Sequence, residues 1–319
     1  DPFAPAPELS CTLRHQRHSS VALPAHWRDN TMKRGAATMR RDAETGRVSS
    51  TESQSPLDAD AAPLSPPLKW AGGKRWLTPS LAPIWASHRH RSLVEPFCGG
   101  LAVALGLDPR RALLADTNPH LINFYAWLQR GLRITLPMRN DEALFYRHRT
   151  RFNALARSDR AGTAEAAALF YFLNRTCYNG LCRFNRAGEF NVPFGRYVRI
   201  GYTRDFTAYR AALARWTFCA SDIDAVGFSR NDFIYADPPY DVQFTQYSRG
   251  GFTWDDQVRT AERLAKHPGP VVLSNQATPR IRKLYRQLGF TLRYLNAPRM
   301  ISCTGRRVPA REVLAAKNL

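Results

Sequence analysis

The sequence predicts an α/β protein built on a doubly wound, mostly parallel sheet, interrupted by an inserted segment that is mainly helical and rich in loops. A strand-like apolar run, Ser92–Phe97, leads through a glycine turn into a helical stretch. The next apolar run, Arg111–Ala115, ends in the acidic residue Asp116. This order of strand, glycine turn, helix and acid-terminated strand begins a doubly wound sheet. The alternation stops at about residue 131 and resumes after residue 204.

The elements before the insert follow from hydrophobic periodicity and from the glycines and prolines that interrupt it. Cys98-Gly99-Gly100 is the turn after the first strand, and Asp116-Thr117-Asn118-Pro119 is the turn after the second. Residues 1–67 show no sustained periodicity and are rich in Pro, Ala, Ser and Thr, which predicts a disordered or low-complexity extension. The elements expected in the first half of the sheet are a loop and helix over 68–85, a strand over 92–97, a helix over 101–107, a strand over 111–115 and a helix over 120–130.

A basic insert separates the two halves of the predicted sheet. Residues 125–204 contain fourteen arginines and no lysine against five acidic residues, a net charge of +9. Two helices are expected in this region, over 142–156 and 163–173, followed by a loop-rich segment that runs to Tyr202. The strands expected after the insert cover 233–236, 271–274, 291–295 and 313–316, with helices over 255–266 and 278–288. The expected domains are the extension 1–67, a first catalytic part 68–130, the insert 131–204 and a second catalytic part 205–319.

The formal net charge of this 319-residue chain is +20, which indicates a polyanionic partner. The first 67 residues carry eight basic and eight acidic side chains, so the whole excess lies in residues 68–319. Because the excess is spread through a segment of globular composition, we expect a folded surface that faces phosphates rather than a basic tail. An arginine-rich composition without such a partner is the alternative.

The cysteines and apolar segments argue against several other classes of protein. The six cysteines form no CxxC pair and no zinc-type cluster with histidine, so we expect reduced thiols, no metal and a cytoplasmic location. Cys98 is expected to be a small buried residue rather than a nucleophile, because no histidine or other base lies near it in the sequence. We find no signal peptide and no apolar run of membrane-spanning length, and we expect a monomer that does not contact membranes.

The tetrapeptide Asp237-Pro238-Pro239-Tyr240 follows a strand-like run and is the most informative feature of the chain. An exocyclic amino group on a nucleobase is hard to methylate because its lone pair is delocalised into the ring. Two acceptors, the Asp237 side chain and the Pro238 carbonyl, would hold both N–H bonds, and the prolines fix φ and add no competing donor. Tyr240 would offer a stacking face to a base taken out of its helix. The alternative is a strand that ends in an ordinary proline-rich turn with a surface tyrosine.

Two glycine-containing segments and Asp116 form a candidate cofactor site. Val94–Gly100 places glycines at a strand-to-helix turn, where backbone approaches a ligand closely, although the G-x-G-x-x-G spacing is absent. Asp116, about twenty residues further on, is placed to accept hydrogen bonds from a ribose diol. Leu68–Lys74 places a lysine and an indole beside two glycines, which suits an amino-acid carboxylate and a sulfonium. The alternatives are glycines kept for packing and an Asp116 that caps a helix; a phosphate loop is excluded because Arg75 follows Gly-Gly-Lys.

Taken together and in this order, these segments resemble the Dam family of DNA adenine-N6 methyltransferases over about residues 67–319. The resemblance implies a class I methyltransferase fold, which is Rossmann-like, and an S-adenosylmethionine-dependent enzyme. It also implies methylation of double-stranded DNA at GATC, by base flipping and direct displacement, with residues 131–204 as the target-recognition domain. The matching segments are Leu-Lys-Trp-Ala-Gly-Gly-Lys (68–74), Glu-Pro-Phe-Cys-Gly-Gly (95–100), Asp-Thr-Asn-Pro (116–119), Asn-Arg-Thr-Cys-Tyr-Asn-Gly-Leu-Cys-Arg-Phe-Asn (174–185), Gly-Glu-Phe-Asn-Val-Pro-Phe-Gly-Arg-Tyr (188–197), Asp-Pro-Pro-Tyr (237–240) and Leu-Ser-Asn (273–275).

The resemblance also implies roles for individual residues. The catalytic residues would be Asp237, Pro238, Pro239 and Tyr240. The cofactor contacts would be Trp70, Lys74, Phe97, Gly99, Asp116 and Asp237. The DNA contacts would be Lys69 on the outer guanine, Tyr178 as a wedge in the base stack, Asn179 beside the orphaned base, Leu181 and Pro193 on the thymine methyl, Arg183 on guanine, and Asn191 and Arg196 on the loop or the phosphates. Two departures from the family pattern are Cys98 and the short stretch Asp241–Tyr247 after the tetrapeptide.

Independently of the family, the segment 174–197 interleaves arginine, asparagine and aromatic residues. Arginine and asparagine read guanine and adenine, and aromatic rings stack on unpaired bases, so the segment indicates contact with DNA. A loop whose aromatics anchor it to the core is the alternative. The other functions left open are cytosine-N4 methylation, methylation of RNA or of protein glutamine, and a catalytically inactive DNA-binding regulator. The aspartate at position 237 favours adenine, because cytosine-N4 enzymes more often carry Ser or Asn there.

Overall fold

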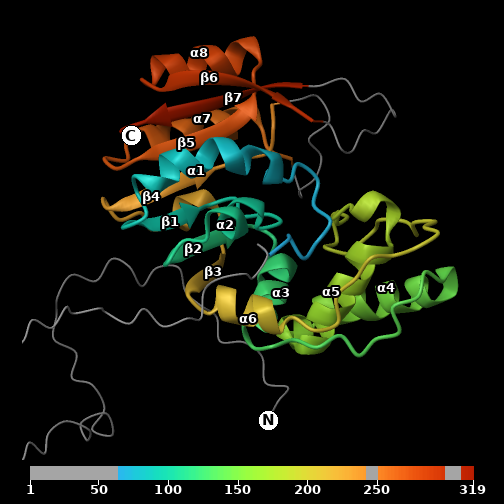
Figure 1. Cartoon of the computed structure of the whole chain (residues 1–319). Coiled ribbons are helices and arrows are strands. Elements are labelled where there is room, and N and C mark those ends of the chain that lie inside the picture. Colours follow the sequence, from blue (N-terminus) through green and yellow to red (C-terminus); the bar gives the residue numbers. More distant parts are fainter. Residues whose placement is uncertain (1–63, 242–250, 299–309) are drawn as a thin grey trace, which may run out of the picture. The chain divides into compact units, whose positions relative to one another are not determined.

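The computed structural model describes residues 64–241, 251–298 and 310–319 (Figure 1). Residues 1–63 of the expected extension and most of the short stretch after Tyr240 lie outside these ranges, so the predictions for both stay untested; residues 64–67 are described, and Leu64 packs against the core. The strands are β1 (Ser92–Glu95), β2 (Ala112–Asp116), β3 (Trp216–Ala220), β4 (Asp232–Ala236), β5 (Val271–Gln276), β6 (Thr291–Ala297) and β7 (Ala310–Lys317). The α-helices are α1 (Thr78–Ala86), α2 (Ala102–Leu107), α3 (Pro119–Gln129), α4 (Glu142–Ala156), α5 (Ala164–Thr176), α6 (Thr207–Leu213), α7 (Trp254–Ala265) and α8 (Pro279–Gln287).

The described strands form a single seven-stranded sheet in the order β3-β2-β1-β4-β5-β7-β6. The strands β1 to β5 pair in parallel, and β7 runs antiparallel to both of its neighbours. The predicted doubly wound, mostly parallel sheet is therefore confirmed. The chain order reverses between β1 and β4, and in such sheets the ligand site lies beyond the carboxyl ends of the strands at that switch point.

Both faces of the sheet are covered, and the side chains of each strand alternate between two apolar layers. In β4, Phe233 and Tyr235 pack on the layer formed with α1, α2 and α3, whereas Ile234 packs on the layer formed with α7 and α8. The same alternation separates Leu93 from Val94 in β1. A parallel strand buried on both faces reads as a continuous apolar run, and this is why the sequence identified these strands.

The strand β3 and the helix α6 before it were not expected from the sequence. β3 is the edge strand next to β2, and its run Trp216–Ala220 leaves Thr217 and Ala220 exposed. An edge strand pairs on one side and keeps exposed positions, so its sequence lacks the continuous apolar run of a fully buried strand. Arg215 and Ser221 flank it directly, which further hides the apolar run in the sequence.

The helices of the insert pack onto the sheet layer that contains α3. The rings of Phe124 in α3 and Tyr171 in α5 are stacked, with centroids 5.6 Å apart and planes 5° apart. Asn118 caps α3, because its side chain accepts hydrogen bonds from the backbone N–H groups of His120 and Leu121.

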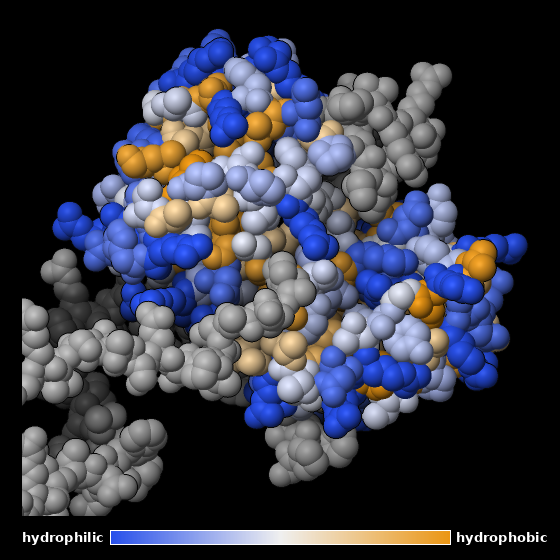
Figure 2. All heavy atoms as spheres, viewed as in Figure 1, coloured by the Kyte–Doolittle hydropathy of each residue, from blue (hydrophilic) through white to orange (hydrophobic). Residues whose placement is uncertain are grey.

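The amino ends of the parallel strands lie at the left in Figure 1. The antiparallel strand β7 ends on that side, so the parallel strands begin there. Hydrophilic residues (blue) are numerous on the same side of Figure 2.

Removing the buried aromatic of β3 should destabilise the fold. Phe218 is fully buried, and its ring lies 5.2 Å from the ring of Tyr125. We expect Phe218→Ala to lower the free energy of unfolding by about 3–5 kcal/mol, because it removes a large core side chain and leaves a cavity. Thr217→Ala, at an exposed position of the same strand, should change it by less than about 1 kcal/mol. Urea unfolding monitored by circular dichroism measures both, and equal effects would contradict the assignment of β3.

Candidate active site and nucleic-acid interface

Asp237 lies directly after the carboxyl end of β4, at the switch point of the sheet, and two side chains hold its carboxylate. The Oδ2 atom is 2.9 Å from the Nζ atom of Lys74, and Oδ1 accepts a hydrogen bond of 2.7 Å from the hydroxyl of Ser274 in β5. The hydroxyl of Tyr235 in turn lies 2.8 Å from that of Ser274. Both carboxylate oxygens are therefore fixed in position.

Lys74 is a buried lysine, with 5% of its side chain exposed, and it links the glycine-rich loop to the tetrapeptide. Its ammonium donates a 2.7 Å hydrogen bond to the carbonyl of Gly72 and lies 4.6 Å from the ring centroid of Tyr240. The Tyr240 hydroxyl donates to Oε2 of Glu312 over 2.6 Å. Burial, followed by the charges of Asp237 and Glu312, raises the pKa of Tyr240 well above its usual range. The tyrosine is thus anchored as a neutral ring.

A side chain of α7 supports the proline turn through a hydrogen bond. The carbonyl of Pro239 accepts a 2.6 Å hydrogen bond from the side chain of Gln257 in α7, and Gln257 accepts one of 3.0 Å from Asn275 in β5. Among the described residues no hydrogen bond reaches the carbonyl of Pro238. Its predicted role as an acceptor for a substrate N–H stays a prediction.

Glu95, the last residue of β1, belongs to the segment Val94–Gly100 of the candidate cofactor site, but the sequence analysis gave it no role of its own. Its side chain is 2% exposed, and its Oε1 atom has no hydrogen-bond partner in the described part of the chain. Burial raises its pKa well above the usual value, the charge of Asp237 raises it further, and a backbone hydrogen bond at Ala104 opposes the shift. A buried carboxylate with an unsatisfied oxygen suits a cationic ligand. Its position at the end of β1 was the available signal.

The glycine turn and Asp116 meet as predicted. The Asp116 carboxylate accepts hydrogen bonds from the backbone N–H groups of Gly99 (3.1 Å) and Asn118 (2.9 Å). Gly99 has φ of +43°, and a Cβ atom there would lie 2.7 Å from Nε1 of Trp70. The indole therefore lies against the turn and leaves no room for a side chain. Phe97 was also predicted for this pocket. Its ring contacts that of Phe252 edge-on, with the two ring centroids 6.0 Å apart.

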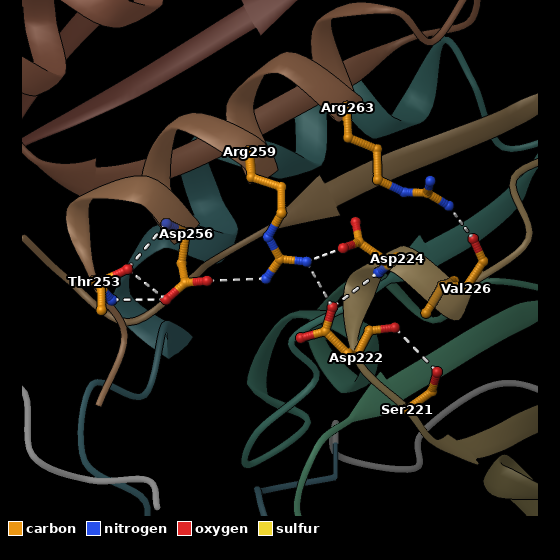
Figure 3. A network of polar contacts seen from close by, with 8 residues as sticks. All are labelled: Ser221, Asp222, Asp224, Val226, Thr253, Asp256, Arg259 and Arg263. Atoms are coloured by element: carbon orange, nitrogen blue, oxygen red, sulfur yellow. Dashed lines mark hydrogen bonds and ion pairs between the residues drawn. The ribbon is translucent and has the colours of Figure 1, made fainter. Parts of the chain in front are cut away.

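A network of polar contacts fixes the loop that follows β3 (Figure 3). The backbone N–H of Ser221 donates to the carbonyl of Asp116 over 3.0 Å. Arg259 in α7 then contacts Asp222, Asp224 and Asp256, and its hydrogen bonds to Asp222 and Asp256 are 3.0 and 3.1 Å long. One guanidinium thus ties this loop, which the sequence analysis did not assign to the site, to α7.

The segment after α5 forms an irregular hairpin that presents several of the predicted DNA contacts. Isolated bridges join Cys177 to Phe194 and Phe184 to Phe190. Tyr178, which adjoins the bridge between Cys177 and Phe194, is 52% exposed, and Asn179 beside it has φ of +52°. The predicted DNA contacts in this hairpin that are exposed are Tyr178, Asn179, Arg183, Pro193 and Arg196, whereas Leu181 and Asn191 are half-buried.

Arg183 is positioned by a neighbour on the opposite arm of the hairpin. Its Nε atom donates a 2.9 Å hydrogen bond to Oδ1 of Asn191. The backbone N–H of Asn191 also donates to the carbonyl of Arg183 over 3.1 Å. The two terminal nitrogens of the guanidinium remain available to a ligand.

The hairpin is attached to the glycine-rich loop through Lys69. Asn174 accepts from the backbone N–H of Lys69 (2.9 Å) and donates to its carbonyl (2.7 Å). The Lys69 ammonium lies 3.7 Å from the ring centroid of Tyr197. A Cβ atom at Gly180 would approach Lys69 Cβ within 2.4 Å, so glycine is required where the two segments touch.

The hairpin is also attached to the turn that follows Asp116. The amide of Asn118 lies 3.4 Å from the sulfur of Cys182, to which it donates. The ring of His120 stacks on Phe184, with centroids 5.1 Å apart and planes 23° apart, and contacts Phe152 edge-on at 5.0 Å. Burial lowers the pKa of His120 to about 4, so the stacked ring is neutral at neutral pH.

These features define the class of protein, an α/β methyltransferase of class I. The model of the D12 class N6 adenine-specific DNA methyltransferase family matches residues 70–301, and the chain belongs to this family. It is 40% identical to a DNA adenine methylase of Vibrio cholerae over 262 residues, which cover 75% of this chain and 90% of that one. It is 37% identical to the Retron Ec67 DNA adenine methylase of Escherichia coli over 268 residues (79% and 91%). The DNA adenine methylase of Escherichia coli strain K12 is 35% identical over 261 residues (75% and 89%).

The protein is therefore an adenine-specific DNA methyltransferase that transfers a methyl group to N6 of adenine. None of the helices in the described part of the chain combines the length and the apolar character of a membrane span. In the same residues, no three or more His, Cys, Asp or Glu side chains gather as a metal site would require. The thiols of Cys98 and Cys177 are buried and free, as expected for Cys98.

The burial of Glu95 predicts a pH dependence of stability. Because its pKa is raised in the folded state, the native protein holds this proton more tightly than the unfolded chain. The free energy of unfolding should therefore fall as pH rises from about 4.5 through the raised pKa. Glu95→Gln removes the charge and should gain stability relative to the parent by roughly 1.4 kcal/mol per pH unit across that window.

Urea unfolding at a series of pH values between about 4 and 8 measures this difference. Glu262→Gln, at an exposed position in α7, is the matched control and should follow the parent at every pH. Parallel curves for Glu95→Gln and the parent would contradict the burial of an unpaired carboxyl group.

Proposed function

We propose that the protein transfers the methyl group of S-adenosylmethionine to N6 of adenine in GATC sites of duplex DNA, by base flipping and direct displacement. The observation that supports this most directly is the fixed carboxylate of Asp237 beside the unpartnered carbonyl of Pro238 at the switch point of the sheet. Two acceptors at that place suit the two N–H bonds of an amino group. Residues 131–204 serve as the target-recognition domain in this proposal.

The residues around the switch point fit S-adenosylmethionine. The unpartnered Oε1 of Glu95 suits the α-ammonium group of an amino acid. Asp116 suits the ribose hydroxyls, because each carboxylate oxygen that accepts a backbone N–H retains a further lone pair. Trp70, held against the turn at Gly99, supplies an aromatic wall beside a cation. When bound, this cofactor supplies a methyl group on a positively charged sulfur, which is a good electrophile.

The chain itself positions the amino group and polarises it. Asp237 and the Pro238 carbonyl would accept the two N–H bonds of adenine N6 and favour a pyramidal nitrogen whose lone pair faces the methyl carbon. Lys74 and Ser274 keep the carboxylate from rotating away. Tyr240, anchored through Glu312, would pack against the flipped base. The nitrogen loses a proton after the new bond forms, without a dedicated base.

The hairpin would read the DNA. Tyr178 is exposed and would wedge into the base stack, with Asn179 beside the orphaned base. The Nε atom of Arg183 donates to Asn191, so the two terminal nitrogens of the guanidinium would form a bidentate contact with O6 and N7 of guanine. The GATC sequence rests on the residues of this hairpin that match the Dam pattern.

Replacing the catalytic acceptor should stop the reaction without releasing the DNA. We expect Asp237→Asn to lower kcat by about 10²–10³-fold, since the isosteric amide loses the acceptor charge and presents N–H bonds. Binding of a GATC duplex should stay close to that of the parent. Asp255→Asn, at an exposed position in the first turn of α7, is the control and should leave kcat unchanged. Rapid-quench methylation and filter binding measure the two quantities; near-parental kcat in Asp237→Asn would refute this mechanism.

The sequence specificity is tested separately from the chemistry. We expect plasmid DNA treated with the enzyme and S-adenosylmethionine to resist endonucleases that are blocked by methylation at GATC. Mass spectrometry of the digested DNA should show N6-methyladenine. Cleavage at GATC together with N6-methyladenine at other sites would show that GATC is not the recognition sequence, while the proposed methylation of adenine N6 would stand. N4-methylcytosine would favour the rival enzyme, and no methylated base with DNA still bound would favour an inactive regulator.

A further inference from the structure

A group of arginines lies at the edge of the sheet opposite the candidate active site. Three of the parallel strands, β1, β2 and β4, begin at this amino edge. The group, called here the amino-edge cluster, consists of Arg89, Arg91, Arg110, Arg111 and Arg230. All are exposed except Arg91, which is half-buried.

Two members of the amino-edge cluster, Arg91 and Arg111, line a polar hollow. The hollow has a volume of about 550 Å³, and the Nε atom of Arg91 is buried without a hydrogen-bond partner in the described residues. One carboxylate, that of Asp232, lies at its floor, where it accepts a 2.7 Å hydrogen bond from the backbone N–H of Ser229 and is 2% exposed. The residues that line the hollow are His90, Arg91, Ser92, Arg111, Ser229, Asn231 and Asp232.

The cluster carries five positive charges, and Asp232 is the one acidic residue among those that line the hollow. None of its five arginines forms an ion pair there; the neighbouring pair, Arg215 with Asp108 at 2.5 Å, neutralises itself. The pKa of His88 nearby is lowered by burial and then by the positive charges of Arg91 and His90. An excess of exposed guanidinium groups beside a polar hollow suits a polyanion.

The amino-edge cluster lies at the opposite ends of the strands from the candidate active site. β4 carries Asp232 at the hollow and leads to Asp237 at the site, five residues of extended chain or about 16 Å further on. β1 and β2 separate Arg91 from Glu95 and Arg111 from Asp116 in the same way. DNA is stiff, with a persistence length of about 150 base pairs, so one segment does not fold around the sheet.

We propose that the amino-edge cluster binds the phosphate backbone of a second DNA segment while the first segment occupies the recognition hairpin. The proposal rests on the function proposed above, since it takes the target duplex to lie at the carboxyl edge. Guanidinium groups bind phosphates bidentately and without regard to sequence. A long DNA molecule supplies such a second segment at high local concentration, so the enzyme passes between segments without entering free solution.

The test is capture of a second duplex by the full-length protein. A GATC duplex is immobilised, loaded with protein and a non-reactive analogue of S-adenosylmethionine, and exposed to a labelled duplex that lacks GATC. We expect capture by the parent and a loss of at least about tenfold in the variant Arg89→Ser/Arg111→Ser/Arg230→Ser. The slope of log K against log salt for this second duplex should fall by about 0.9 for each phosphate contact removed.

The matched control, Lys283→Ser/Arg286→Ser/Arg293→Ser, removes the same charge from exposed positions of α8 and β6 and should capture as the parent does. Both variants should methylate a short single-site duplex at the parental rate. Equal capture by the amino-edge variant, no capture by the parent, or capture that requires two protein copies would overturn the proposal. A fluorescent label attached beside the cluster provides a further test. If polyglutamate changes its signal while no second duplex is captured, the cluster binds an acidic protein instead, and the proposal is wrong. If the parent fails to methylate the short duplex, the proposed function fails instead.

Discussion

The ion pair between Lys74 and Asp237 constrains the rest of the site. Both groups lie largely out of water, so removing either partner would leave a buried charge uncompensated. The pair therefore fixes where the glycine-rich loop meets the end of β4, and Ser274 fixes the second oxygen of the same carboxylate. Because this loop also carries Lys69, which is bonded to Asn174, the position of the chemistry is set together with the position of the recognition hairpin.

A second connection joins the same two regions. The turn that begins at Asp116, which we assign to the ribose, continues into Asn118 and His120, and these contact Cys182 and Phe184 of the hairpin. The hairpin thus rests on both segments that would hold the cofactor. Its arms are bridged to each other, and Tyr178 is exposed beside the bridge between Cys177 and Phe194. This arrangement places rigid supports beneath side chains that must enter DNA, as precise readout of bases requires.

The sequence predicted those parts of the fold and site whose cause is local. Buried parallel strands read as apolar runs, and the acid at position 116 and the tetrapeptide at 237 stand where strands end. The sequence did not identify β3, because this edge strand has exposed positions that interrupt its apolar run. It also gave no role of its own to Glu95, whose importance comes from burial beside a neighbouring strand, and missed the Nε contact of Arg183 with Asn191, which depends on the pairing of two hairpin arms. The roles of the individual site residues stay predictions.

A crystal structure of the protein with a non-reactive analogue of S-adenosylmethionine and a GATC duplex tests the central claim most directly. The account predicts an adenine outside the helix, with N6 about 3 Å from both an Asp237 oxygen and the Pro238 carbonyl oxygen. It also predicts the α-ammonium group of the analogue at Glu95. An adenine still stacked in the duplex, or an Asp237 carboxylate turned away from the base, would contradict the account.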